Sequence, residues 1–274
     1  MASTINILNL LLPLLYGATA AVYALDFIKE KLPFQNSKRV FLLISILAHL
    51  FYLYSRTVEY NHTPITNKFE IFSVLAFSIA LSYFILELLT DIRRTGAFII
   101  FISLLFQLIS SLFITHNYSV PEVLRNRMLG LHVISALLGY SGFAISAVYG
   151  ILFLTLYKNL KTNKFGLFFN RLPSLEILEQ LSFYSFVIGF ILLTVAIIIG
   201  FIWLPQAFPN FSYADPKLIA TFIVWVFYGA GIISKMMANW YGKKVVGFSI
   251  AGFILVILSL IITSQLAQSF HSFY

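Results

Sequence analysis

Eight long apolar runs, separated by short polar segments, constrain this chain more than any other feature. The runs cover roughly residues 5–27, 39–58, 69–90, 95–115, 128–157, 178–204, 217–238 and 244–267. Each has about the 20 residues that a helix needs to cross the hydrocarbon core of a bilayer. Only 10% of the residues are charged, against about 25% in a soluble domain. The chain therefore has too few polar side chains to cover a surface that faces water. We predict an all-α, polytopic integral membrane helical bundle with about eight transmembrane helices, forming one transmembrane domain over residues 1–274.

The lysines and arginines sort by loop. With the N-terminus outside, the inward-facing segments carry 13 of them and the outward-facing segments carry 5. Cytoplasmic loops are enriched in these residues, so we predict a multi-pass protein of the cell membrane (inner or plasma membrane) with both termini outside. Topology thus explains the net charge of +8, and the predicted partner is the lipid bilayer, with no nucleic acid. The first run lacks a preceding basic stretch, which favours a spanning helix over a cleaved signal peptide.

Two of the five histidines occupy positions that suggest chemistry. His49 lies at the middle of the second run, where an ionisable side chain should face the bundle interior and have a partner. It is a haem or metal ligand, a proton relay, or a neutral imidazole bonded to a neighbouring helix. His132 starts the fifth run on the predicted outer side, and is either a ligand or an ordinary boundary residue.

The outer loop between the sixth and seventh runs is rich in aromatic residues. It contains Trp203, Phe208, Phe211 and Tyr213, which could form an apolar platform for a flat ligand. An interfacial aromatic belt, common in membrane proteins, is the alternative. Asp215, followed by a proline, has the pattern of a helix N-cap with proline at the first helical position.

Other polar and small residues have structural interpretations. We expect Glu87 to snorkel or to pair with the arginines at 93–94, and Glu70 to cap the start of its helix. Gly139 and Gly142 should permit close helix packing.

The segment 165–178 contains Pro173 and leucines at helical spacing, which predicts a short interfacial helix running into the sixth span.

The absence of cysteine excludes disulfides and thiolate metal sites. The chain also lacks a phosphate-binding glycine loop, a nucleophile elbow and a zinc-protease motif, so no catalytic residue is predicted. A transporter would call for Gly or Pro at mid-span in related positions, but the prolines lie mainly at run ends and in loops.

Several segments share an order and spacing along roughly residues 40–265: Thr66–Ser73 with Leu86-Glu87 and Gly96–Phe98, Leu131–Tyr140, Arg171–Glu176, and Gly200–Trp203 with Asp215–Lys217 and Val224–Tyr228. Together they resemble the cytochrome c assembly family of membrane proteins, which includes CcsA-like and HemX-like proteins. The resemblance implies that haem is the cofactor.

The resemblance also implies site residues. His132 corresponds to the first external ligand of the haem iron, and Asp215 and Trp203 correspond to the haem-binding segment. His49 is similar to an intramembrane histidine of the family and would be a deeper iron ligand. Phe208, Phe211 and Tyr213 stand where the family has tryptophans. Ile233-Ser234 stands about where the family has its second external histidine.

Two functions follow from this resemblance. The first is a membrane component of cytochrome c maturation that binds or delivers haem toward the outer face, with apocytochrome c or another cytochrome c biogenesis protein as partner. The alternative is a HemX-like regulatory or scaffolding membrane protein that influences tetrapyrrole (haem) biosynthesis without itself binding haem. It would act through its cytoplasmic segment 158–177.

Overall fold

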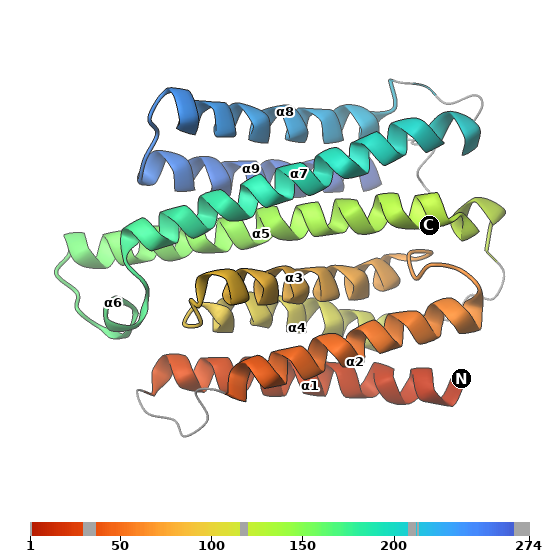
Figure 1. The fold of residues 1–274 in the computed structure, drawn as a ribbon, viewed down its shortest axis with the longest axis horizontal. Coiled ribbons are helices and arrows are strands. Elements are labelled where there is room, and N and C mark those ends of the chain that lie inside the picture. The colour runs from red at the N-terminus through yellow and green to blue at the C-terminus, as the bar shows by residue number, and fades with distance from the viewer. Residues whose placement is uncertain (1, 30–36, 116–119, 208–211, 213, 266–274) are drawn as a thin grey trace. The chain divides into compact units, whose positions relative to one another are not determined.

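The computed structural model describes residues 2–29, 37–115, 120–207, 212 and 214–265, and these residues are almost entirely helical (Figure 1). The elements in chain order are α1 (Ala2–Ile28), α2 (Ser37–Tyr60), α3 (Lys68–Thr90), α4 (Gly96–Phe113), the 3-10 helix η1 (Glu122–Arg125), α5 (Arg127–Lys161), α6 (Leu167–Arg171), α7 (Leu175–Ala207), α8 (Pro216–Met237) and α9 (Lys243–Gln265).

Eight of these helices are long and apolar enough to span a membrane, which confirms the predicted all-α, multi-pass architecture. The fifth and seventh helices are the longest, at 35 and 33 residues. At 1.5 Å per residue α5 is about 52 Å long, well beyond the hydrocarbon thickness of about 30 Å. The outward direction of the two termini remains a prediction.

The chain forms two compact units, residues 1–130 and residues 131–274. In the first unit, α1 contacts α2 and α4, and α3 contacts the same two helices, so the four helices close a bundle. The start of α3 is set by Asn67, whose side chain accepts hydrogen bonds from the backbone N–H groups of Phe69 and Glu70. This cap satisfies donors that a helix N-terminus leaves open.

A buried carboxylate joins three helices at the end of the bundle where α3 ends. The fully buried carboxylate of Glu87 accepts hydrogen bonds from Tyr23 at 2.6 Å and from Arg39 at 3.0 Å. The prediction that Glu87 pairs with the arginines at 93–94 is therefore wrong, because α1 and α2 supply closer donors. Arg93 instead bonds Asp91 at 2.8 Å, and Arg39 bonds it at 2.5 Å. These two guanidinium groups hold the pKa of the exposed Asp91 carboxyl below its usual range.

At the opposite end of α3, the expectation that Glu70 caps the helix is wrong. Asn67 provides the cap. Glu70 is buried, accepts hydrogen bonds from the backbone and hydroxyl of Thr66, and pairs with Arg56 of α2 at 2.5 Å. A buried charge requires such pairing, so Glu70 joins α2 to the loop preceding α3.

The second unit contains α5 to α9, and its helices approach closely at glycines. An ideal Cβ at Gly142 would lie 2.8 Å from the Ser185 carbonyl oxygen and from the Cα of Gly189. At Gly139 the corresponding distance to the Gly189 carbonyl oxygen is 3.0 Å. The predicted packing role of Gly139 and Gly142 is confirmed, since small residues let membrane helices approach. Hydroxyl bonds from Ser146 add a polar contact between α5, α7 and α9.

The short helix predicted near 165–178 exists, but it does not run into the sixth span. It is α6, of five residues, and Leu172 in extended conformation follows it. Pro173 belongs to the predicted helical segment, yet α7 begins two residues later, at Leu175. The backbone N–H of Ile177 bonds the Ser174 hydroxyl, so a serine rather than the proline marks this helix start.

Candidate functional site

His132 lies in the first two turns of α5, and its ring is held by α7. Its Nδ1 lies 2.8 Å from the backbone carbonyl oxygen of Ala196. A carbonyl only accepts hydrogen bonds, so Nδ1 carries the proton and donates it. The neutral ring therefore has its lone pair on Nε2, and none of the residues that the structure describes donates a hydrogen bond to that nitrogen. Histidines that bind metals in proteins have this arrangement, with the second nitrogen donating to a carbonyl or carboxylate.

A glycine on α7 makes room for the His132 ring. An ideal Cβ at Gly200 would lie 3.0 Å from both Cε1 and Nδ1 of His132, but 4.0 Å from Nε2. Gly200 is one turn beyond Ala196 on the same face of α7. The helix therefore supplies both the acceptor and the space that orient Nε2 away from it.

The start of α8 lies in the same unit and begins with an Asp-Pro-Lys element. Asp215 Oδ1 accepts hydrogen bonds from the backbone N–H groups of Lys217 at 2.8 Å and Leu218 at 3.4 Å. Pro216 occupies the first turn. The predicted N-cap is thus confirmed, and it accounts for the buried position of Asp215. The predicted role of Asp215 in binding a cofactor stays a prediction.

Of the four aromatics predicted as a porphyrin platform, the structure describes only Trp203. Its side chain is buried, with 6% of its surface exposed, so a ligand could stack on it only after displacing the groups that cover it. Phe208, Phe211 and Tyr213 lie outside the described residues. The platform remains a prediction.

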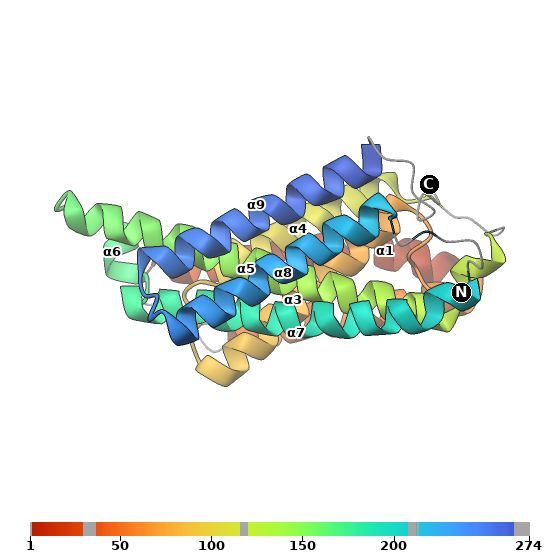
Figure 2. The same cartoon turned by 90° about the horizontal axis from the view of Figure 1, so that it is seen from above.

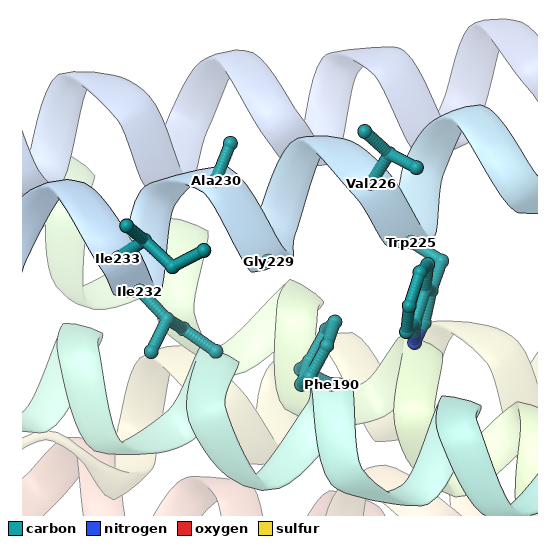
Figure 3. A pocket seen from close by; sticks show the side chains of 7 residues that line it. All are labelled: Phe190, Trp225, Val226, Gly229, Ala230, Ile232 and Ile233. Atoms are coloured by element: carbon teal, nitrogen blue, oxygen red, sulfur yellow. The ribbon is translucent and has the colours of Figure 1, made fainter.

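Between α7 and α8 lies an apolar groove with a volume of about 410 Å³. Phe190 and Trp225 stand at one side of it, and Gly229 and Ile233 line the stretch beyond them (Figure 3). The indole N–H of Trp225 is already donated to Thr194 at 2.8 Å. The groove therefore presents carbon to a ligand and offers no axial ligand for iron.

His49 is fully buried in the first unit and bridges three helices, as predicted from its mid-span position. Its Nδ1 lies 3.0 Å from the Tyr16 hydroxyl of α1, and its Nε2 lies 3.0 Å from the Ser73 hydroxyl of α3. Ser73 donates its own proton to Gln107 Oε1 at 3.0 Å, and Gln107 donates to Ser111 on α4.

These bonds define the protonation of His49. Because the Ser73 proton goes to Gln107, Ser73 accepts from Nε2–H of His49, and Nδ1 accepts from the Tyr16 hydroxyl. Both ring nitrogens are used. An iron at His49 would have to break one of these hydrogen bonds, whereas Nε2 of His132 needs no such change. The geometry matches the neutral, bonded imidazole that the sequence left as one option.

Comparison with known proteins identifies the family of this chain. The family model described as "Cytochrome C assembly protein" matches residues 5–271. The chain belongs to the cytochrome c assembly protein family. The match covers nearly the whole chain and so extends the resemblance beyond residues 40–265.

Named relatives within the cytochrome c assembly family fall into two groups. Cytochrome c biogenesis protein CcsA of Guillardia theta is 27% identical over 238 residues, which is 80% of this chain and 79% of that protein. CcsA of Prochlorococcus marinus (strain MIT 9312) is 27% identical over 275 residues, covering 91% and 88%. Protein HemX of Bacillus subtilis (strain 168) is 24% identical over 271 residues, covering 94% of each chain.

For this member of the family, sequence reasoning identified His132 but missed the residues that orient it. Ala196 acts through a backbone carbonyl, which every residue carries, so no side-chain pattern could reveal it. Gly200 belongs to the segment Gly200–Trp203, which carries part of the family resemblance. Ala196 and Gly200 are small residues four positions apart on one helix, and this spacing indicates a recess on one face of α7.

Proposed function

We propose that this protein is a membrane component of cytochrome c maturation that binds haem at His132 and delivers it toward the outer face. Family membership and the CcsA relatives support a role in cytochrome c biogenesis. The observation that carries the haem assignment is the His132 ring, with Nδ1–H donated to the Ala196 carbonyl and the Nε2 lone pair open.

His132 fits haem iron, because a neutral imidazole is a common protein ligand of that metal. When bound, haem would supply the vinyl groups that become linked to cysteines of an apocytochrome. The residues of the chain would bind and orient the haem: His132 would hold the iron, the Ala196 carbonyl would fix the tautomer of His132, and Gly200 would leave room for its ring. His49 is the deeper ligand only if one of its two hydrogen bonds is given up.

The direction of delivery rests on the positive-inside rule. With 13 of the 18 lysines and arginines on the inward side, the starts of α5 and α8 face outward. His132 and Asp215 then lie at the outer side of the cell membrane (inner or plasma membrane), with the aromatic loop between them. The chain has no cysteine, so its partners include an apocytochrome c with reduced cysteines and the proteins that hold and reduce it.

The experiment is an absorbance spectrum of protein purified from haem-replete cells. We expect a Soret band in the wild type and its loss in His132→Ala, because the iron ligand is gone. His116→Ala, which removes another histidine of the predicted outer side, is the matched control and should keep the band. A wild type without a Soret band, or a band unchanged in His132→Ala, would sink the proposal.

A second function is favoured by one comparison, because the alignment with HemX covers 94% of both chains. In this case the protein is a regulatory or scaffolding membrane protein that influences tetrapyrrole biosynthesis. The segment 158–177 would contact its partner, and Lys158, Lys161 and Lys164 are exposed there. Deleting the gene separates the two functions: loss of c-type cytochromes with normal haem precursors favours assembly, and the reverse favours regulation.

A further inference from the structure

Lys217 places a positive charge near the start of α8 without a recorded partner. It is the second residue of the helix, directly after Pro216. Within the described residues, no hydrogen bond or ion pair is recorded for its ammonium group, although the side chain is half-buried. The nearby carboxylate of Asp215 already accepts two backbone hydrogen bonds at the cap. A partly buried charge of this kind is costly until an anion pairs with it.

Helix register brings Lys217 toward His132. The ring of Phe143 on α5 stacks on the ring of Tyr228 on α8, with the ring centroids 3.7 Å apart. His132 lies 11 residues, about three turns, before Phe143 on the same face of α5, and Lys217 lies 11 residues before Tyr228 on the same face of α8. Along the helix axes both residues are therefore about 16 Å from the Phe143–Tyr228 contact.

Both positions lie toward the N-terminal ends of α5 and α8, which run in the same direction through the unit (Figure 2). His132 and Lys217 therefore lie at the same level along two helices that are in contact. One ligand that lies across this end of the two helices can reach both the open nitrogen and the ammonium group.

A ligand that binds both His132 and Lys217 must carry a metal ion for the imidazole nitrogen and, close to it, an anionic group for the ammonium. Haem has iron at its centre and two carboxylates on one edge, whereas a metal-free apolar molecule would leave both groups unused. Hydrogen bonds from an ammonium to a carboxylate are short and charge-assisted. We infer that Lys217 binds a carboxylate of the porphyrin whose iron is held by His132, so that the site selects haem with free propionates in one orientation. The inference rests on the proposed function.

The test uses two probes, haemin and its dimethyl ester, in which both carboxylates are blocked. Each is titrated into the purified full-length protein in detergent, and the Soret change gives its dissociation constant. We expect the wild type to bind haemin at least about tenfold more tightly than the ester, which is the scale of one charge-assisted hydrogen bond. Lys217→Gln should bind both probes equally, and Lys217→Arg should restore the preference.

The control is Lys244→Gln, which removes an exposed lysine at the start of α9 and should keep the wild-type preference. Helicity measured by circular dichroism checks that each variant is folded. If the wild type binds both probes equally, or Lys217→Gln keeps the preference, this inference is wrong while haem binding at His132 stands. If neither probe gives a Soret shift with the wild type, the proposed function fails as well.

Discussion

Substitution of Gly200 by alanine tests whether α7 orients the iron ligand. The added Cβ would lie 3.0 Å from Cε1 and Nδ1 of His132, closer than normal carbon contacts of about 3.5–4.0 Å. The ring must therefore move by several tenths of an ångström, which lengthens or bends the 2.8 Å hydrogen bond to Ala196.

The expected magnitude follows from that hydrogen bond. A bond of this kind contributes about 0.5–1.5 kcal/mol, and about 1.4 kcal/mol corresponds to tenfold in affinity. We expect haemin to bind Gly200→Ala roughly 2- to 12-fold more weakly than the wild type. Gly200→Val, with a larger side chain in the same space, should bind it more weakly still.

The assay is a haemin titration followed at the Soret band. Gly247→Ala is the matched control, because an added Cβ at that helical glycine of the same unit meets no atom within 4 Å. If Gly200→Ala binds haemin as tightly as Gly247→Ala does, and with the same spectrum, then α7 does not orient the ligand and the reasoning is refuted.

Three further predictions concern stability, each measured by thermal unfolding in detergent. Glu87→Ala should cost about 1–3 kcal/mol, because the buried Tyr23 hydroxyl loses its acceptor, whereas the exposed Glu122→Ala should be neutral; equal effects would contradict this. Gly142→Ala should cost about 1–3 kcal/mol by pushing α5 from the α7 backbone, unlike Gly247→Ala, and an unchanged midpoint would argue against the close packing. Since the pKa of Asp91 is lowered by folding, its stabilising contribution is complete above about pH 4, the unfolded value, and is lost as the pH falls through the lower folded pKa. Asp91→Asn should therefore flatten the acid side of the stability profile, and an unchanged profile would exclude this role.

The number and limits of the membrane spans could be predicted because hydropathy is a local property. Each predicted run agrees with a helix to within a few residues, and α5 and α7 are the longest in both. The cost of leaving backbone groups unpaired in lipid permits little besides helices there. The cap at Asp215 was predictable for the same reason, since its donors are the next residues along the chain.

Pairings between helices could not be predicted in the same way. Glu87 was paired with its sequence neighbours, yet its donors are Tyr23 and Arg39, which lie 64 and 48 residues away. The acceptor for His132 is likewise 64 residues distant and is a backbone atom. The sequence could therefore name the histidine, but the geometry that leaves one nitrogen open depends on how α5 and α7 pack.

The central claim is that Nε2 of His132 is the iron ligand, and chemical rescue tests it most directly. His132→Gly removes the imidazole and leaves room for a free one. We predict that this variant purifies without a Soret band and that imidazole added with haemin restores it, while the wild type needs no imidazole. A His132→Gly variant that binds haemin normally without imidazole would contradict the claim.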